Sequence, residues 1–287
     1  MIQIARRLSL ALAVLAPAAP AALATQAAQA APAAPAYNVL TVYRETVKPG
    51  KGPAHDAHES AWARAVAAAK PPTGFLAMTA MSGAPENWYI SAFASWAEYE
   101  SANKASAASP ALTAIGNKFA ALDNEYLNDA RGMVLTIRQD LSYGGPADLA
   151  ASRYFTVTRV SVRPGHTDEY EANRKMVKSA HESGSLADGY SMWQAVAGAP
   201  AGTYFIFVAR KSLSEIDAGA SIHGAAYQAA LGGPEGQKKM AANTAAAVIS
   251  TQTDHFAFAP QQSIPPAAWV AADPGYWKYK TAPKKTP

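Results

Sequence analysis

The stretch that decides the fold occurs twice, as LTVYRETVKPG at residues 40–50 and as FTVTRVSVRPG at residues 155–165. In each copy β-branched and aromatic residues alternate with polar ones, and Pro-Gly follows. This pattern predicts a β-strand that ends in a turn. Three further pairs hold the same shift of 115 residues (155 minus 40): Gly74 and Gly189, Gly83 and Gly198, Tyr89 and Tyr204. A fixed internal period over so many turn residues indicates a duplicated module.

Each copy reads as strand, helix, strand, strand, helix, strand. In the first copy we expect strands at 39–47, 74–82, 88–94 and 133–141, and helices at 53–70 and 110–130. The second copy repeats this order and closes with a helix at 234–247 and a strand at 248–258. A βαββαβ order is ferredoxin-like, with an antiparallel sheet covered by helices on one face. The expected fold class is therefore α+β, with two tandem ferredoxin-like modules.

The rest of the chain divides around these modules. Residues 1–24 have Arg6-Arg7, a short apolar run and a small-residue cleavage pattern, which together predict a signal peptide. The other expected segments are an Ala/Pro-rich spacer at 25–36, module 1 at 37–141, a linker at 142–152, module 2 at 153–259 and a Pro-rich extended tail at 260–287. We therefore expect a bacterial periplasmic or secreted protein, with an uncleaved membrane anchor as the alternative. No stable membrane insertion is expected after cleavage.

Composition excludes several kinds of chemistry. The chain has 287 residues and no cysteine, which rules out disulfides, thiolate nucleophiles and Cys-based zinc sites. The formal charge of +4 falls to about +2 if Arg6 and Arg7 are removed with the signal peptide, and nucleic-acid binding usually needs a clustered basic face. No nucleic-acid partner is therefore expected.

Over residues 37–259, the element order and the internal repeat resemble the dimeric α/β-barrel superfamily. That superfamily includes antibiotic-biosynthesis-type monooxygenases, EthD-like and NIPSNAP-like proteins and relatives of chlorite dismutase. The resemblance implies that the two halves pair their sheets into an intramolecular pseudo-dimeric barrel, in a monomer or a homodimer. It also implies a small apolar or aromatic molecule bound between sheet and helices. Some members bind haem, but this sequence has no haem-attachment motif, and we expect no cofactor.

One helix carries the candidate catalytic group. His55, His58, Glu59 and Trp62 fall on one stripe of the helix at 53–70. Two imidazoles at i, i+3 with a carboxylate can hold a divalent metal or act as acid–base groups. A polar pocket lining and a His-rich helix face over the sheet are the other interpretations. We favour the His-rich face and expect no metal. If the site is catalytic, His58 is the predicted general base.

Further candidates come from the repeated strands. Arg44 and Arg159 occupy the same strand position in both copies, which suggests either an anion clamp or a structural salt bridge. We favour the salt bridge. Tyr43, Tyr89 and Tyr204 belong to a set of aromatic residues that either line an apolar pocket or fill the core.

The function these patterns favour is an exported α/β-barrel protein that binds a small apolar or aromatic ligand. A cofactor-independent, oxygenase-like activity is the enzymatic hypothesis. The alternative is a non-catalytic envelope protein with a structural or protein-interaction role. A cavity between sheet and helices favours the first, and a solid interface in both halves favours the second.

Overall fold

The computed structural model describes residues 37–184, 186, 189–218 and 224–280, so the predicted signal peptide and spacer lie outside the described residues. Within them, eight antiparallel strands close into one barrel in the order β1-β3-β2-β8-β5-β7-β6-β4. We call residues 37–141 the first half and residues 153–259 the second half. The strands are β1 (Val39–Val47), β2 (Leu76–Ala80), β3 (Glu86–Phe93), β4 (Leu127–Ile137), β5 (Tyr154–Val162), β6 (Ser191–Ala197), β7 (Thr203–Arg210) and β8 (Val248–Phe258).

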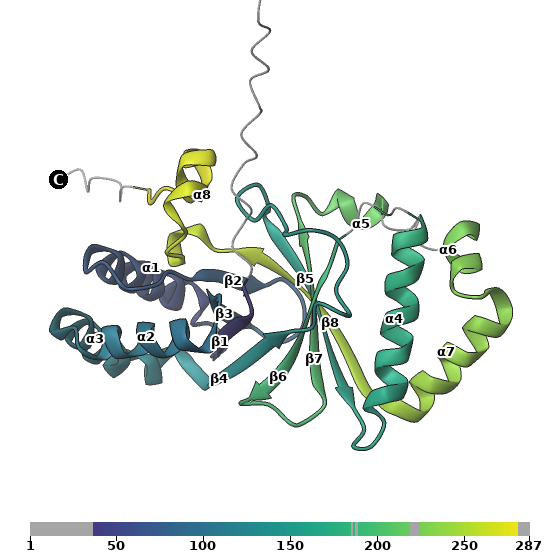
Figure 1. The fold of residues 1–287 in the computed structure, drawn as a ribbon. Helices are drawn as coiled ribbons and strands as arrows, with labels where there is room; N and C mark the ends of the chain where they lie inside the picture. The colour runs from purple at the N-terminus through teal and green to yellow at the C-terminus, as the bar shows by residue number, and fades with distance from the viewer. Residues whose placement is uncertain (1–36, 185, 187–188, 219–223, 281–287) are drawn as a thin grey trace, which may run out of the picture. The chain divides into compact units, whose positions relative to one another are not determined.

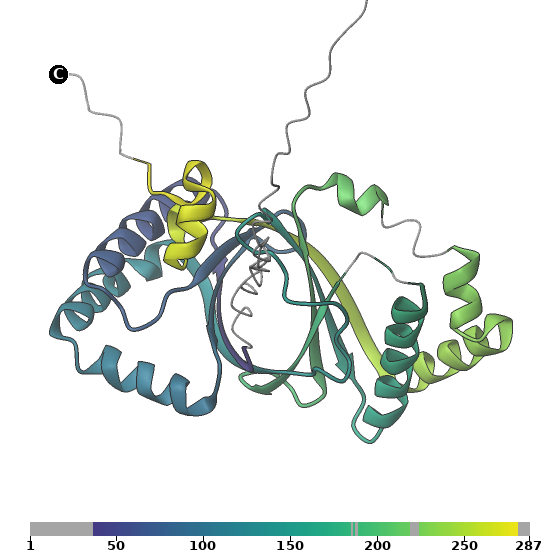
Figure 2. The same cartoon turned by 45° about the horizontal axis from the view of Figure 1, so that its top comes forward.

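The helices lie outside the barrel, and each half carries its own set (Figures 1 and 2). In the first half they are α1 (Gly52–Ala68), α2 (Trp96–Ala107) and α3 (Pro110–Tyr126). In the second half they are α4 (Thr167–Gly184), α5 (Ser214–Ala218), α6 (Ala225–Ala230) and α7 (Gly233–Ala247). No helix among the described residues is both long enough and apolar enough to cross a membrane.

The strand order confirms the predicted duplication. The first half has the ferredoxin-like order β2-β3-β1-β4, and the second half has the equivalent order β6-β7-β5-β8. The halves join at two seams, because β2 pairs with β8 and β4 pairs with β6. The predicted intramolecular pseudo-dimeric barrel is therefore the observed architecture.

The repeated stretch also repeats its backbone geometry. Gly50 and Gly165, which end the two copies, have φ angles of 77° and 84°. Only glycine adopts such angles without strain, which explains why the Pro-Gly turn recurs. A register shift falls between Thr46 and Val47 on β1, and another at the equivalent step between Ser161 and Val162 on β5.

The inside of the barrel is a solid apolar core. Leu40 and Val42 point inward from β1 and pack with residues from every other strand, including Trp88, Phe205 and Phe256. Because successive strand residues alternate between faces, Thr41, Tyr43 and Glu45 point outward, toward the helices. The outward face of β1 is therefore the face on which the strand meets the helices.

The C-terminal segment is more structured than the predicted extended tail. It forms a 3-10 turn η2 (Pro260–Gln262) and two short helices, α8 (Ala267–Ala272) and α9 (Pro274–Trp277). Trp277 is buried in the barrel core, and its Nε1 donates a hydrogen bond to the Ala150 carbonyl at 2.8 Å. The aromatic residues between the prolines thus anchor the segment, because burying a large ring outweighs the cost of ordering the chain.

The predicted boundaries around β4 are wrong at both ends, and the strand expected to reach residue 141 ends at Ile137. The helix expected to reach residue 130 ends at Tyr126, and the strand expected from residue 133 begins at Leu127. Residues 128–132 are mostly polar or small and look helical or loop-like on their own. They pair with β1 across Tyr43 to Thr46, and this pairing overrides the local pattern.

Candidate functional site

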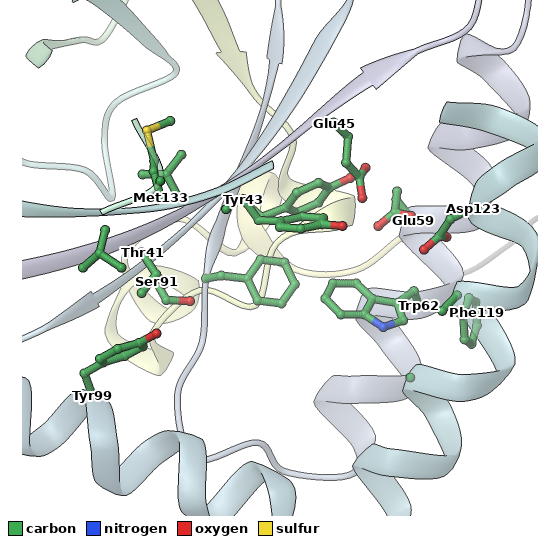
Figure 3. A pocket seen from close by; sticks show the side chains of 18 of the residues that line it. Thr41, Tyr43, Glu45, Glu59, Trp62, Ser91, Tyr99, Phe119, Asp123 and Met133 are labelled. Atoms are coloured by element: carbon green, nitrogen blue, oxygen red, sulfur yellow. The ribbon is translucent and has the colours of Figure 1, made fainter. Parts of the chain in front are cut away.

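A cavity of about 590 Å³ lies between the outer face of the first half of the barrel and its helices (Figure 3). The lining residues come mainly from β1, α1, α3 and the strands beside β1. They are Thr41, Val42, Tyr43, Glu45, Glu59, Trp62, Phe75, Tyr89, Ser91, Tyr99, Gly116, Phe119, Ala120, Asp123, Gly132, Met133, Val134, Ala197 and Gly198. A concave space of this size suits a small organic ligand.

The local structure explains why these side chains meet. On β1, residues 41, 43 and 45 share the outward face. On α1, Glu59 and Trp62 are one turn apart, and on α3 residues 116, 119, 120 and 123 recur at helical spacing. No described residue of α3 is buried, so this helix stands off the sheet and leaves the space open beneath it.

The cavity has aromatic walls and two polar ends (Figure 3). Trp62 stacks on Phe75 with ring centroids 5.2 Å apart, and Tyr89 meets the Trp62 ring edge-on at 6.3 Å. The carboxyl groups of Glu45, Glu59 and Asp123 lie together at one end, whereas the hydroxyl groups of Thr41, Ser91 and Tyr99 lie at the other.

Two imidazoles stand at the acidic end. His55 Nε2 lies 2.8 Å from Glu45 Oε2, and His58 Nε2 lies 3.3 Å from Asp123 Oδ1. Glu59 sits between them, with its Oε1 4.0 Å from His55 Nε2 and 3.8 Å from His58 Nε2. Glu45, His55, His58 and Glu59 are all buried, and Asp123 is partly exposed. We call these five residues the acid–imidazole cluster.

The crowding shifts the ionisation of the cluster. Burial, reinforced by the nearby charge of Glu45, raises the pKa of Glu59 to about 8. Burial lowers the pKa of His55, but the hydrogen bond to Glu45 and the charges of Glu45 and Glu59 outweigh it, so the pKa is raised. Burial and the charge of Glu59 raise the pKa of Tyr89 well above its ordinary value. The pKa of about 8 favours the protonated, neutral carboxyl form of Glu59 at neutral pH.

Gln262, in the C-terminal segment, holds residues beside the cavity in place through hydrogen bonds. Gln262 of η2 accepts hydrogen bonds from Asn87 Nδ2 at 3.1 Å and from the Tyr89 hydroxyl at 3.4 Å. Its Nε2 donates to Asp56 on α1 at 2.9 Å. One buried amide thus ties β3 to α1 beside the aromatic wall.

The second half fills the equivalent space. At the 115-residue shift, Val160 replaces Glu45, Tyr170 replaces His55, Asn173 replaces His58, Arg174 replaces Glu59 and Val177 replaces Trp62. Leu141, Val160, Tyr170, Met192 and Tyr204 pack into one apolar cluster on this side.

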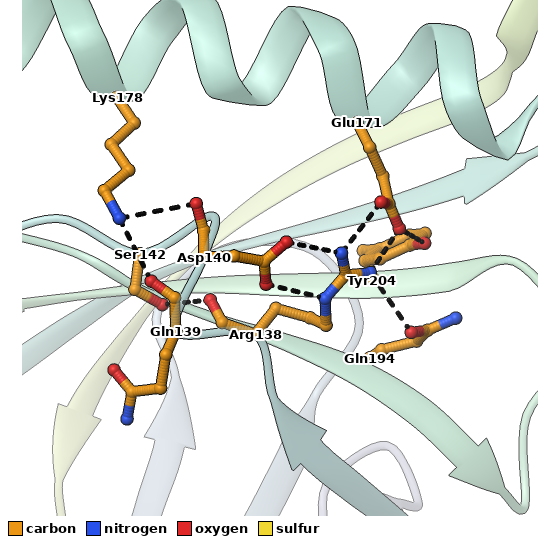
Figure 4. A network of polar contacts seen from close by, with 8 residues as sticks. All are labelled: Arg138, Gln139, Asp140, Ser142, Glu171, Lys178, Gln194 and Tyr204. Carbon is orange, nitrogen blue, oxygen red and sulfur yellow. Dashed lines mark hydrogen bonds and ion pairs between the residues drawn. The ribbon is translucent and has the colours of Figure 1, made fainter.

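A polar network joins the end of the first half to α4 and β7 of the second half (Figure 4). The Tyr204 hydroxyl donates to Glu171 Oε1 at 2.8 Å, and Arg138 Nη2 donates to Glu171 Oε2 at 2.7 Å. Arg138 also donates through Nε to Asp140 at 2.9 Å. These contacts hold α4 against the end of the first half. The charged side chains of Arg138, Asp140 and Glu171 each have a partner.

The predicted site residues separate into three groups. Tyr43, Glu59, Trp62 and Tyr89 line the cavity. His55 and His58 are not among the described lining residues and lie behind Glu45, Glu59 and Asp123. Arg44, Arg159 and Tyr204 lie elsewhere.

The two repeated arginines make polar contacts away from the cavity. Arg44 forms a bidentate pair with Glu86, with Nη2 at 2.6 Å from Oε1 and Nε at 3.2 Å from Oε2, and its guanidinium lies 4.8 Å from the Trp88 ring centre. Arg159 donates to Gln252 Oε1 at 2.7 Å. Arg44 thus forms the structural salt bridge that we favoured, whereas the contact that Arg159 makes with Gln252 is a hydrogen bond to a neutral amide and not a salt bridge.

Sequence reasoning missed Glu45 and Asp123 as members of the cluster. Glu45 did carry a signal, because it is a charged residue on an otherwise apolar strand face and Val160 stands at its place in the repeat. Asp123 carried no such signal in the sequence, because its place in the cluster depends on how α3 packs against α1.

No protein-family model matches the chain, and no curated protein matches it. Similar solved structures include a candidate monooxygenase from Lactobacillus acidophilus, which is 8% identical, with 78% of this chain and 95% of that chain covered and a TM-score of 0.49. An anthrone oxidase-like protein is 11% identical over 78% and 92% of the two chains, with a TM-score of 0.49. A mutant chlorite dismutase from Candidatus Nitrospira defluvii, in complex with cyanide, is 8% identical over 79% and 92%, with a TM-score of 0.45.

Likeness at this level of identity says nothing about chemistry, so the site is interpreted from its own side chains. The strand order itself is that of a dimeric α/β barrel, and here a single polypeptide supplies both halves.

Proposed function

We propose that the first half binds a small, largely apolar aromatic molecule in its cavity and acts on it as an oxygenase-like enzyme. One observation carries this proposal: the two halves share a scaffold, but only the first combines a cavity of about 590 Å³ with a buried acid–imidazole cluster among the described residues. The apolar packing of the second half is the arrangement expected of a purely structural module. The difference argues against the alternative of a barrel that is structural throughout.

The walls define the class of ligand. Trp62, Phe75 and Phe119 offer ring faces and edges, which favour a flat aromatic molecule. None of the described lining residues is Lys or Arg, so a carboxylate or phosphate would find no counter-charge there. The hydroxyl groups at one end and the carboxyl groups at the other suit a neutral ligand with polar substituents.

The polar end of the ligand would meet Glu59 rather than His58. Glu59 lines the cavity, whereas His58 is packed against the Phe119 and Tyr126 rings behind it. We therefore transfer the role of substrate contact from His58, the predicted general base, to Glu59. The oxygenase-like part of the proposal rests on the resemblance of the element order and the internal repeat to a superfamily that includes monooxygenases.

Native mass spectrometry of the protein purified from its source cells is the first test, with a bound small molecule as the expected result. A titration with naphthol tests the site itself. Trp62→Val, which copies Val177 of the second half, should weaken naphthol binding roughly tenfold or more, equivalent to about 1.4 kcal/mol. Trp96→Val is the matched control, because Trp96 is half-exposed and is not among the described lining residues. Equal affinity in the wild type and Trp62→Val would reject the proposal.

We also propose that the protein is exported, on the basis of the signal-peptide pattern in residues 1–24. Intact mass measurement of the chain recovered from the periplasm or medium tests this. The expected mass is that of a chain starting after Ala24 or Ala30. Recovery of the full-length chain only from the cytoplasm would contradict export.

A further inference from the structure

We propose that the acid–imidazole cluster binds one divalent transition-metal cation, of the class of Mn²⁺, Fe²⁺ or Zn²⁺. The ligands would be Glu45 on β1 with His55 and Glu59 on α1, three residues that are all buried. Two triplets already have one ligand atom per residue within 4.8 Å of one another: Glu45 with His55 and Glu59, and His58 with Glu59 and Asp123. Glu59 belongs to both triplets and marks the centre of the site.

The spacing around Glu59 fits a bridging ion. Its Oε1 lies 4.0 Å from His55 Nε2 and 3.8 Å from His58 Nε2, which is too long for a hydrogen bond. Metal–nitrogen and metal–oxygen bonds are each about 2.0–2.2 Å, so two ligand atoms on one ion stand at most about 4.2 Å apart. The distance from Glu59 to His55 falls within this limit, and Glu45 Oε2 lies 2.8 Å from the same imidazole nitrogen, so these three residues can share one ion. His55 and His58 do not belong to one group of ligand atoms within 4.8 Å among the described residues, so the ion is not assigned to both imidazoles.

The residues of the cluster favour a bound cation. Within the described part of the chain, the ion pairs of Glu45, Glu59 and Asp123 are all made with the two imidazoles, and none involves Lys or Arg. Buried carboxylates are costly unless a counter-charge is close. Mixed imidazole and carboxylate donors without sulfur suit manganese, iron or zinc.

The duplication supplies an internal comparison. In the second half, Val160, Tyr170 and Asn173 stand at the positions of Glu45, His55 and His58. Arg174 stands at the position of Glu59, so a positively charged residue replaces a proposed ligand. The ligand set is thus confined to the half that has the cavity.

The inference goes beyond the proposed function and does not depend on it. Glu45, Glu59 and Asp123 line the cavity as well as the cluster, so a bound cation would face the polar end of a ligand. The chemistry would then be metal-dependent, which departs from the cofactor-independent activity that we expected from the sequence.

The test uses the whole protein after treatment with a chelator and dialysis. Mn²⁺ is added and the free ion is counted by electron paramagnetic resonance, and Zn²⁺ binding is measured by calorimetry. We expect one ion per chain and a rise in melting temperature on adding the ion. Glu59→Gln and His55→Gln keep the side-chain size and should weaken binding roughly tenfold or more, equivalent to about 1.4 kcal/mol each.

Two comparisons make the outcome decisive. His166→Gln, at a partly exposed histidine just before α4, should bind the ion like the wild type. Each variant is melted without metal, so that a loss of fold is separated from a loss of ligand atoms. Absence of saturable binding of both ions to the folded wild type would overturn the inference. Binding that Glu59→Gln and His55→Gln both leave unchanged would overturn it as well, because the ion would then lie elsewhere.

Discussion

Leucine at position 116 would fill the cavity without removing a single contact. Gly116 lies in the middle of α3 and lines the cavity. A Cβ built at this position meets no atom within 4 Å, and Gly116 is not among the described glycines with positive φ. The added side chain therefore meets open space at a position that lines the cavity.

Two effects of opposite sign are expected from Gly116→Leu. Glycine in a helix interior is about 0.8–1.0 kcal/mol less favourable than alanine, and leucine is nearly as good as alanine. The free energy of unfolding should thus stay constant or rise by up to about 1 kcal/mol, which is about 2–4 °C in melting temperature for a chain of this size. Naphthol affinity should fall roughly tenfold or more, about 1.4 kcal/mol, because the leucine occupies the site.

Calorimetric titration with naphthol and a thermal melt measure both effects on the same sample. Ala114→Leu is the matched control: it adds a leucine to the same helix at an exposed position outside the described lining. Unchanged affinity in Gly116→Leu would refute the assignment of the cavity. A large fall in melting temperature would show that α3 packs more tightly than we describe.

Three further predictions concern the scaffold. Trp277→Ala should lower the free energy of unfolding by about 3–5 kcal/mol in urea titrations, because it empties a buried ring site, and a loss below about 1 kcal/mol would show that the C-terminal segment is dispensable. Glu86→Gln should lower the free energy of unfolding by about 1–3 kcal/mol, because it leaves Arg44 without its charged partner. The affinity for naphthol should stay unchanged. Weaker naphthol binding would support the anion-clamp hypothesis instead. The hydrogen bond from Arg138 lowers the pKa of Glu171, so its stabilisation is present above the ordinary glutamate pKa of about 4.3 and is lost as pH falls through the lowered value. The urea midpoint of the wild type should exceed that of Glu171→Gln at neutral pH, and the two midpoints should approach each other in acid. A difference between the midpoints that does not change with pH would contradict a stabilising role for the Glu171 carboxylate.

The repeat was enough to predict the strand order, because duplicated turns and strand faces constrain how each half folds. The helix expected from residue 234 and the strand expected at 248–258 agree with α7 and β8 to within a residue. The end of α3 was not predictable, since residues 128–132 become a strand only when β1 is beside them. The helices of the tail were not predictable either, because they depend on burying Trp277 in a core built by other segments.

The helical stripe brought His55, Glu59 and Trp62 together correctly, because all three lie on one helix at i, i+4 and i+7. Spacing along one helix could not show that Glu45 and Asp123 complete the cluster, since they come from β1 and α3. The opening of the cavity depends on how far α3 stands from the sheet, which no local pattern encodes.

Hydrogen–deuterium exchange with and without a saturating aromatic ligand tests most directly whether the two halves differ in function. With naphthol as the ligand, we expect slower exchange in α1, α3 and β1, and no change in α4, α7 and β5. Protection in the second half, or equal protection in both halves, would contradict this expectation.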